Sequence, residues 1–359
     1  MISIVIPTYR ERENLEPLVS QLSDVMAVAG HSYEILIVDD DSQDGTEEEV
    51  QEHLTKYPVR LIVRRGQRGL STAVLHGFNE ARGDILVCMD ADLSHPPDVV
   101  PRMISRLDEE AVEFVMASRY VSGGSTDEGW GLSRWLNSKV ATLMARPFAR
   151  VTDPMSGCFA LRRSVYEQAE DLNPIGYKVG LELLVKCGCA NVAEVPFHFS
   201  DRRLGHSKLN LRERLNYLRH LKRLADFKFG VLSKFAQFCA VGMTGMLVDV
   251  GAFVLLTSLS LSFPLARAVA ILVAMTWNFI LNRWITFSRS PDGNLLRQYA
   301  KFVATCSVGG LLNWAVSTSL VAKIGAFQRT PILAVLLGIA AGTVFNFLIS
   351  RRWVFGNRS

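Results

Sequence analysis

The sequence predicts an α/β domain with a mostly parallel sheet, followed by an α-helical membrane domain. Two observations predict this fold class. Short β-rich runs alternate with helical patterns over roughly the first 200 residues, and four long apolar stretches follow from about residue 232. Strands that alternate with helices form parallel sheets covered on both faces. A chain of 359 residues is long enough for both parts.

Five strands are expected in the first part, and helical patterns fall between them. The strands are expected at Ile2–Ile6, Glu34–Val38, Val59–Val63, Ile85–Met89 and Phe114–Ala117. The clearest helical patterns cover Leu15–Ala29 and Leu70–Ala81. In sheets of this kind, ligands bind beyond the carboxyl ends of the strands. We therefore expect the functional residues in the turns that follow the strands.

Acidic clusters follow two of these strands. Asp39, Asp40 and Asp41 follow the second strand, and Asp90 and Asp92 follow the fourth, in "CMDADLSHPPD". Both clusters should lie on one edge of the sheet. Two aspartates at positions i and i+2 can face one cation, and their hard oxygen atoms suit Mg²⁺ or Mn²⁺ bound to a phosphate. The alternative is a turn in which an aspartate caps the next helix.

Four apolar stretches dominate the second part of the chain. They cover roughly Leu232–Leu259, Phe263–Ile285, Tyr299–Ala322 and Pro331–Ile349. Each is long enough to cross a hydrocarbon core of about 30 Å as a helix. Buried core helices are the alternative, but four such stretches joined by short loops favour membrane spans.

Positive charges predict how these spans are oriented. One set of loops and the tail carry Arg283, Arg289, Arg297, Lys301, Arg351, Arg352 and Arg358. The opposite loops carry only Arg267, Lys323 and Arg329. The positive-inside rule places the richer set in the cytosol. The N-terminus "MISIVIPTY" does not have the pattern of a signal peptide, so the first domain is expected on the same side.

The membrane part contains an internal repeat. "FAQFCAVGMTGMLVD" at Phe235 resembles "YAKFVATCSVGGLLN" at Tyr299, and "NFILNRWITF" at Asn278 resembles "NFLISRRWVF" at Asn346. Each copy reads as a helical hairpin, so the two copies share one orientation. Asp249 falls inside the first span. Such a carboxylate is either functional or hydrogen-bonded to a neighbouring helix.

A basic amphipathic segment links the two parts. In "LNLRERLNYLRHLKRLADFKFGVL" the leucines recur at helical spacing with basic residues opposite. Such a helix lies either in a lipid headgroup layer or against the first domain. We therefore expect a domain over residues 1–209, a helical region over 210–231 and a membrane domain over 232–359.

Composition gives no indication of nucleic-acid binding or of a zinc site. The net charge of +4 is too small to indicate nucleic-acid binding. Cys187 and Cys189 are the only close pair of cysteines, and a zinc site would need a second pair. Reduced thiols that serve as small apolar residues are the expectation.

The ordered motifs resemble the family 2 glycosyltransferases of GT-A (Rossmann-like) fold, and in particular the polyprenol-phosphate mannosyltransferases. The motifs are "IPTYRERENL", "EILIVDDDSQDGT", "RGLSTAVLHGF", "MDADLSHPP", "SRY", "GWGLSRWLNSK", "DPMSGCFALRRSVYE" and "FSDRRLGHSKLN". The four-span part resembles the GtrA-like membrane domain that accompanies such transferases. The resemblance therefore covers nearly the whole chain.

The resemblance assigns roles on the donor side. It places Pro7, Tyr9 and Glu11 at the nucleobase and Val38 and Asp40 at the nucleoside. These five residues would bind the nucleotide of a nucleotide sugar.

The resemblance also implies a metal site. Asp90 and Asp92 would bind the metal on the diphosphate, with the backbone of Ala91 close by. Ser94 stands where the family pattern often has Gln, so a hydroxyl or a water would take the place of the third ligand. The expected cofactor is Mg²⁺ or Mn²⁺.

On the acceptor side, the resemblance places Arg119, Arg134 and Ser138 at the acceptor phosphate. Arg202 and Lys208 would bind phosphate when their loop closes over the site, and Lys178 would reach the sugar. Asp92, Arg119, Arg202 and Lys208 are the residues expected to act in catalysis.

The implied reaction transfers mannose from GDP-mannose to a polyprenyl (dolichyl) phosphate, with inversion and without a covalent enzyme intermediate. Two alternatives stay open. A UDP-sugar such as UDP-glucose is a possible donor in the same reaction, and the membrane domain could move lipid-linked sugar instead of anchoring the catalyst. In each case the chain is an integral membrane protein whose first domain and C-terminus are cytoplasmic.

Overall fold

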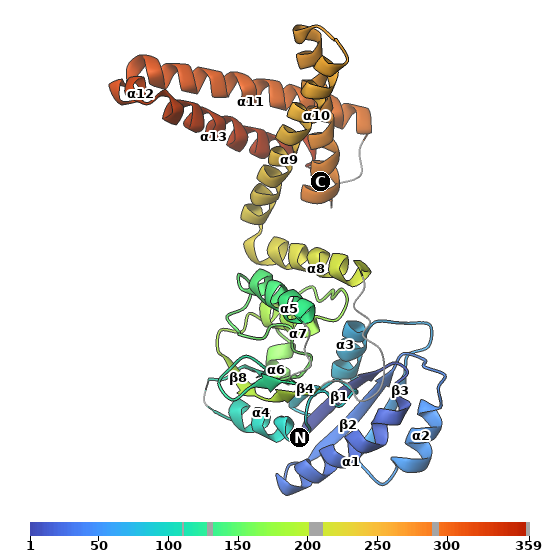
Figure 1. Cartoon of the computed structure of the whole chain (residues 1–359). Coiled ribbons are helices and arrows are strands. Elements are labelled where there is room, and N and C mark those ends of the chain that lie inside the picture. Colours follow the sequence, from blue (N-terminus) through green and yellow to red (C-terminus); the bar gives the residue numbers. More distant parts are fainter. Residues whose placement is uncertain (110, 128–131, 201–210, 289–293, 357–359) are drawn as a thin grey trace. The chain divides into compact units, whose positions relative to one another are not determined.

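The computed structural model describes residues 1–109, 111–127, 132–200, 211–288 and 294–356. The chain forms two compact units, Met1–Lys228 and Phe229–Ser359. Figure 1 shows the sheet and its covering helices in the first unit, and the long helices of the second.

The first unit is built on a mixed sheet, mostly parallel, of seven strands in the described residues. Their order is β3-β2-β1-β4-β7-β5-β8. The strands are β1 (Ile2–Thr8), β2 (Tyr33–Asp39), β3 (Val59–Val63), β4 (Ile85–Cys88), β5 (Phe114–Ser118), β7 (Phe159–Arg162) and β8 (Val192–Pro196). Only β7 runs antiparallel to its neighbours β4 and β5. Short strands β6 (Ser125–Thr126) and β9 (His198–Phe199) form a separate parallel pair.

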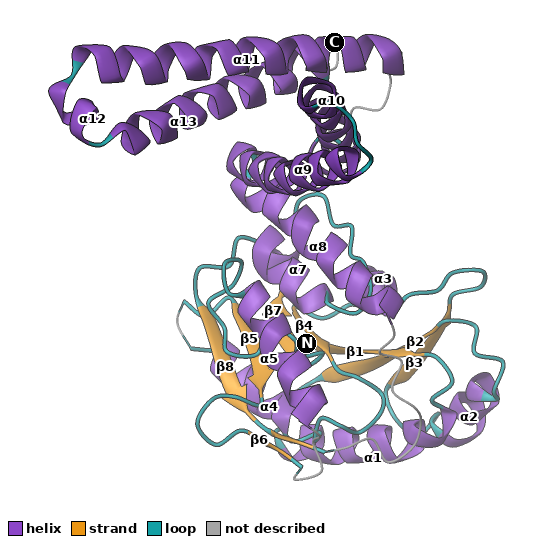
Figure 2. Cartoon of the chain, turned by 45° about the horizontal axis from the view of Figure 1, so that its top comes forward, coloured by secondary structure: helices purple, strands orange, loops and turns teal. Residues whose placement is uncertain are grey.

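Helices cover both faces of this sheet (Figure 2). One face packs against α1 (Arg12–Val28), α2 (Thr46–His53) and α4 (Val99–Leu107). The other face packs against α3 (Leu70–Glu80), α6 (Arg163–Tyr166) and α7 (Val179–Lys186). Because both faces are covered, successive residues of one strand all point into apolar cores, and β1 is buried along its whole length.

The structure confirms the predicted fold class. All five predicted strands are present, and their observed ends differ from the predicted ones by at most two residues. The pattern did not indicate β7 or β8, which are four and five residues long. It also could not show that β7 lies between β4 and β5, because the order of strands in a sheet is not a local property of the sequence.

Helix α8 (Leu211–Phe229) belongs largely to the first unit. Its buried Leu221 and Leu224 pack against α5 (Leu132–Ala145) and α7. The hydroxyl of Tyr217 donates to the carbonyl of Ala141 at 2.7 Å. Of the two predicted positions, a lipid headgroup layer and the surface of the first domain, the structure shows this helix packed on the first domain. The predicted helical region over residues 210–231 is thus divided at Lys228, where the first unit ends.

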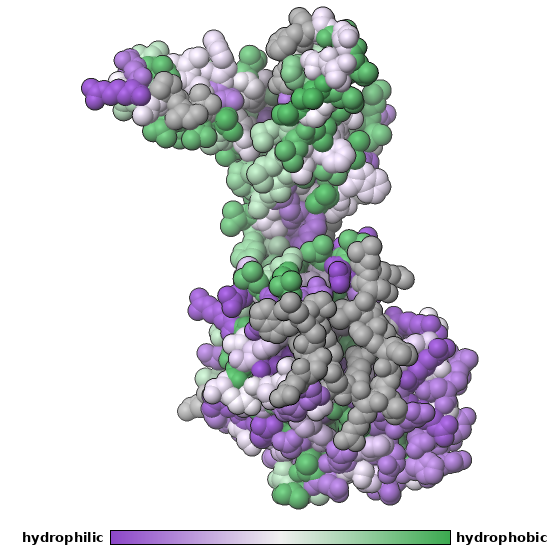
Figure 3. Space-filling view, in the orientation of Figure 1, coloured by the Kyte–Doolittle hydropathy of each residue, from purple (hydrophilic) through white to green (hydrophobic). Residues whose placement is uncertain are grey.

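Four long helices form the second unit. They are α9 (Val231–Ser258), α10 (Phe263–Leu281), α11 (Leu295–Lys323) and α13 (Pro331–Ile349), and the short α12 (Gly325–Arg329) follows α11. A π-helical turn continues α10 (η1, Asn282–Thr286) and another continues α13 (η2, Ser350–Val354). Within the described residues, two stretches, Val231–Ser258 and Ala268–Thr286, are long and apolar enough to cross a membrane. Hydrophobic side chains cover much of this unit's surface (Figure 3).

The repeat seen in the sequence corresponds to two helical hairpins. α9 packs on α10, and α11 packs on α13. In each hairpin a glycine of the first helix faces an asparagine of the second. A Cβ on Gly245 would lie 2.1 Å from Oδ1 of Asn278, and one on Gly309 would lie 2.0 Å from Oδ1 of Asn346. Glycine at these positions allows the two helices to approach closely.

Equivalent phenylalanines from the two hairpins form one shared core. Phe238 of the first repeat packs on Phe347 of the second, with ring centroids 5.7 Å apart. Phe302 packs on Phe279 at the same distance, which is the reciprocal contact. The two repeats therefore contact one another through the same positions, as identical subunits do across a two-fold axis.

Candidate active site

The two acidic clusters lie at one edge of the sheet. β1 pairs in parallel with both β2 and β4, so the carboxyl ends of all three strands point the same way. Asp39 and Asp40 stand at the end of β2, and Asp90 and Asp92 follow β4. The expected common edge is therefore observed.

The turns at this edge hold several residues in the left-handed backbone region. Arg10 has a φ of 59°, Gln43 of 50° and Leu93 of 57°, and all three follow strands at this edge. Residues other than glycine adopt this conformation at a cost, and such residues concentrate at ligand-binding sites.

Asp90 lies against the backbone of Gly157. A Cβ on this glycine would come within 2.3 Å of Oδ2 of Asp90. The Asp90 carboxylate can therefore take this position only because residue 157 has no side chain. His95 completes this side of the site, with Nδ1 3.8 Å from the same oxygen.

Asp92 is buried and is held by Ser94. The Ser94 hydroxyl donates to Oδ1 of Asp92 at 2.5 Å, and the Ser94 backbone N–H donates to the same atom at 3.1 Å. Ser94 is itself buried. Its side chain thus orients a carboxylate, and its predicted place as a third metal ligand stays a prediction.

His95 stays neutral at physiological pH. Burial lowers its pKa to about 4, and the positive charges of Arg119 and Lys178 act in the same direction, against Asp92 and Asp153. The ring stacks on Phe197 with centroids 4.8 Å apart. His95 therefore adds no positive charge beside the two aspartates.

Arg119 is held by a buried carboxylate. Its Nε and Nη2 donate to the two oxygens of Asp153 at 2.7 and 2.8 Å, and its backbone N–H donates to Oδ2. Burial alone would lower the pKa of Arg119, but the hydrogen bonds and the charge of Asp153 raise it above its ordinary value. The guanidinium is therefore charged and fixed in orientation.

Lys178 belongs to the same charged cluster. Its Nζ donates to the carbonyl of Met155 at 2.9 Å. Burial lowers its pKa to about 8, and Arg119 acts in the same direction, whereas Asp153 and Asp90 oppose the shift. The structure thus brings Asp90, Arg119 and Lys178 into mutual electrostatic contact from three separate segments.

The predicted nucleotide residues lie around the ends of β1 and β2. Pro7 and Val38 are paired neighbours in the sheet, and both are buried. Tyr9 is partly exposed, and Glu11 accepts a hydrogen bond from Asn14. Both oxygens of Asp40 are engaged, one by Arg64 and the other by the backbone N–H of Gly69.

The predicted acceptor residues are only partly described. Ser138 lies on α5, and its hydroxyl is 2.8 Å from that of Tyr120, the residue after Arg119. Arg134 lies on the same helix, and its side chain is outside what the structure describes. Arg202 and Lys208 lie outside the described residues.

The pair of carboxylates suits a divalent ion. In the described part of the chain, no three or more His, Cys, Asp or Glu side chains form a metal-binding group. Mg²⁺ uses a two-carboxylate donor set together with substrate phosphates and water, and Asp90 and Asp92 would supply such a set. Gly157 allows the Asp90 carboxylate to lie where it does.

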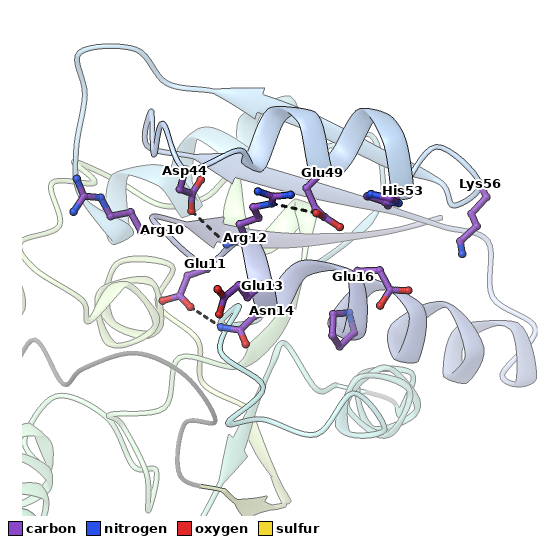
Figure 4. A pocket seen from close by; sticks show the side chains of 11 residues that line it. Arg10, Glu11, Arg12, Glu13, Asn14, Glu16, Asp44, Glu49, His53 and Lys56 are labelled. Carbon is purple, nitrogen blue, oxygen red and sulfur yellow. Dashed lines mark hydrogen bonds and ion pairs between the residues drawn. The ribbon is translucent and has the colours of Figure 1, made fainter.

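A cavity of about 880 Å³ lies beside this edge, between the N-terminal turn of α1 and α2. Figure 4 shows that charged side chains line it, with Arg12 bound to Glu49. Of the predicted site residues that the structure describes, only Glu11 lines this cavity. The charged cluster at β4 lies outside it, and we base the site on the cluster.

Family models and known relatives agree with the motifs. The model described as glycosyl transferase family 2 matches residues 3–169, and the model described as GtrA/DPMS, transmembrane domain, matches residues 237–355. A protein of Pyrococcus furiosus named dolichol-phosphate mannosyltransferase is 40% identical over 98% of both chains. This chain belongs to the dolichol-phosphate mannosyltransferase family. It is therefore a glycosyltransferase with a membrane domain, as the resemblance predicted.

Other members and more distant structures are also similar. Proteins with the same name from Saccharomyces cerevisiae and Mycosarcoma maydis are each 43% identical over 64% of this chain, and the matches cover 88% and 81% of those proteins. The structure of mannosyl-3-phosphoglycerate synthase from Rubrobacter xylanophilus covers 63% of this chain and 74% of its own, with 20% identity and a TM-score of 0.48. That of glucosyl-3-phosphoglycerate synthase from Mycobacterium tuberculosis covers 64% and 79%, with 19% identity and a TM-score of 0.46.

Sequence reasoning missed three residues that shape this member of the mannosyltransferase family. Asp153 and Gly157 occur in the motif "DPMSGCFALRRSVYE", and His95 stands three residues after Asp92, but no role was assigned to any of them. Asp153 orients Arg119, and Gly157 makes room at Asp90. Their distance along the chain from the residues they serve conceals these roles.

Proposed function

We propose that this protein transfers mannose from GDP-mannose to a polyprenyl (dolichyl) phosphate and so makes polyprenyl-phosphate mannose. One observation supports this most strongly. Two carboxylates suited to a metal diphosphate lie in one cluster with the fixed guanidinium of Arg119 and the ammonium of Lys178. The family membership and the names of three relatives support the same reaction.

The acceptor needs no general base. A phosphomonoester has a second pKa near 6 and is already an anion at neutral pH. A hydroxyl nucleophile would require a base to remove its proton. The neutral His95 is buried against Phe197 and need not act as one. The reaction therefore depends on positioning and on charge.

Asp90 and Asp92 would hold a divalent ion, Mg²⁺ or Mn²⁺, on the donor diphosphate. When bound, the ion neutralises the charge that develops on the leaving diphosphate. Ser94 keeps one oxygen of Asp92 in place, and the absence of a side chain at Gly157 allows the Asp90 carboxylate to take its observed position.

The cationic side chains bring two anions together. Repulsion between two unit charges about 4 Å apart is about 4 kcal/mol at an effective dielectric constant of 20. Two guanidinium N–H groups of Arg119 bind Asp153, which fixes the orientation of the charged group, and this cation would bind the acceptor phosphate. Lys178 would contact the sugar, and Arg134, Ser138, Arg202 and Lys208 keep the roles predicted above.

A single displacement then completes the reaction. An oxygen of the lipid phosphate forms a bond to the anomeric carbon while the bond from that carbon to the diphosphate oxygen breaks. GDP leaves with the electron pair, and the configuration at the anomeric carbon inverts. No residue of the protein becomes covalently attached to the sugar.

We further propose that the first unit rests on the cytosolic membrane surface. The apolar side chains of α5 that are exposed recur at helical spacing, at Leu136, Val140 and Leu143. On the adjacent α8, Leu215 and Leu218 are also exposed. Apolar residues at helical spacing on two packed helices suit a lipid surface, and Arg134 and Ser138 on α5 would then be close to lipid headgroups. The membrane domain anchors the catalyst near its lipid acceptor.

The test compares donors and acceptors directly. Purified full-length protein is incubated with polyprenyl phosphate and either GDP-mannose or UDP-glucose, each labelled in the sugar, and label is followed into the organic phase. We expect transfer from GDP-mannose, an inverted linkage in the product, and at least a hundredfold loss in Asp92→Asn. Transfer from UDP-glucose alone, or a retained configuration, would overturn the proposal.

A further inference from the structure

The β3–α3 loop carries an arginine onto the face of Tyr9. The guanidinium carbon of Arg68 lies 4.7 Å from the centroid of the Tyr9 ring, and that of Arg10 lies 5.3 Å from it. Arg68 is exposed to solvent. The resemblance assigns Tyr9 to the nucleobase but assigns nothing to Arg68.

Asp40 fixes this loop at both ends. Its Oδ1 accepts a hydrogen bond from Nε of Arg64 at 2.7 Å, and its Oδ2 accepts one from the backbone N–H of Gly69 at 2.7 Å. Arg64 and Asp40 are both buried. Gly69 has a φ of 142°, a backbone conformation that other residues rarely adopt. The backbone of Arg68, directly before Gly69, is therefore held beside Tyr9.

We propose that Arg68 selects guanine as the base of the donor, an inference that rests on the proposed function. A base that stacks on Tyr9 would displace the Arg68 guanidinium from the ring face on which it now lies. Because the loop is anchored by Asp40, the guanidinium then lies at the edge of that base. The structure thus offers two planar groups, one to stack on the base and one to bind its edge.

The chemistry of the base edge explains the selection. Guanine presents two adjacent acceptors, O6 and N7, which match the fork of a guanidinium. Uracil has two carbonyl acceptors, O4 and O2, but an N3–H donor separates them, so no two adjacent acceptors face one guanidinium fork. Arg68 therefore forms two hydrogen bonds with a guanine nucleotide and at most one with a uracil nucleotide.

Calorimetric titration of the full-length protein with GDP and with UDP, each with Mg²⁺, tests this proposal. In Arg68→Ala we expect the affinity for GDP to fall about tenfold or more and that for UDP to change less than about threefold. Arg68→Lys keeps the charge but lacks the fork, and should lose most of the same preference. Arg65→Ala, an exposed arginine of the same loop, is the control and should leave both affinities unchanged.

The possible outcomes separate this proposal from the proposed donor. If Arg68→Ala lowers the affinity for GDP and the affinity for UDP by the same factor, the side chain binds the diphosphate and the proposal is wrong. If neither affinity changes, Arg68 has no role at the base, and the proposal is again wrong while GDP-mannose stands. If the unaltered protein prefers UDP, the donor itself is wrong, and the selection of guanine falls with it.

Discussion

The Asp153 carboxylate is fully buried and is shared between three donors of Arg119. Glu194 in turn accepts hydrogen bonds from the backbone N–H groups of Thr152 and Asp153. The guanidinium that is proposed to meet the acceptor phosphate therefore depends on a chain of polar contacts that passes through the buried Asp153 carboxylate. Removing one member of a buried ion pair leaves the other charge uncompensated.

Replacing Asp153 by asparagine tests this chain. We expect Asp153→Asn to lower the free energy of unfolding by about 3 kcal/mol and to slow transfer strongly, because Arg119 loses both its charge partner and its orientation. Chemical denaturation and initial rates measure the two effects. Asp108→Asn, which alters a carboxylate just beyond α4, is the control. An unchanged unfolding midpoint would contradict the importance of this pair.

Gly157 gives a second prediction at the residue scale. A methyl group at this position would overlap the Asp90 carboxylate. In Gly157→Ala we expect Mn²⁺ to bind at least about tenfold more weakly in the presence of GDP, with secondary structure retained. Electron paramagnetic resonance of free Mn²⁺ measures this directly. Binding at the original affinity would show that Asp90 is not a ligand.

At the scale of elements, α8 is joined to α7 through a buried histidine. Nδ1 of His220 lies 3.6 Å from Oε2 of Glu182, and both side chains are 1% exposed. Burial lowers the pKa of His220 below its ordinary value of 6.5; Glu182 opposes the shift, and Lys186, Arg223 and Lys178 reinforce it. The docked helix therefore prefers a neutral imidazole.

The pH dependence of stability follows from this shift. Between the lowered pKa and 6.5, the unfolded chain binds more protons at His220 than the folded domain does. The free energy of unfolding therefore falls as the pH drops below about 6.5. His220→Gln should weaken this dependence, whereas His53→Gln, at an exposed position, should keep it. Unfolding midpoints between pH 5 and 7.5 measure the difference, and equal slopes in both variants would exclude His220 as its source.

The hairpins of the membrane unit give a matched pair of variants. A Cβ on Gly309 would collide with the Asn346 side chain, whereas a Cβ on Gly310 would meet nothing within 4 Å. We expect Gly309→Ala to destabilise the unit in detergent by about 1–3 kcal/mol, the usual cost of overpacking. Gly310→Ala should have no effect. Equal melting temperatures in the two variants would contradict the close approach of α11 and α13.

At the scale of the whole molecule, local patterns predicted most of the fold. Apolar runs located β1 to β5, and apolar length located α9, α10, α11 and α13, because both signals lie in consecutive residues. The pattern could not place β7 between β4 and β5, since strand pairing joins distant segments. It also left the position of α8 open, because a helix with leucines at that spacing suits either a lipid surface or a protein surface.

In the candidate site, too, residues that stand together in the sequence could be predicted, whereas contacts between distant segments could not. Asp90 and Asp92 were evident because they follow one buried strand. The Asp153 partner of Arg119 is 34 positions away along the chain, and the residue that makes room at Asp90 is Gly157. The loop that brings Arg68 to Tyr9 is held by hydrogen bonds to Asp40. The resemblance had placed Asp40 at the nucleoside and did not indicate this contact.

The central claim is that a divalent ion on Asp90 and Asp92 enables a lipid phosphate to attack the sugar of a nucleotide sugar. Its most direct test is the transfer of labelled mannose from GDP-mannose to polyprenyl phosphate by the purified protein, before and after every divalent ion is chelated. We expect transfer to stop in the chelator and to return when Mg²⁺ or Mn²⁺ is added back. Transfer at the full rate in the chelator would contradict it.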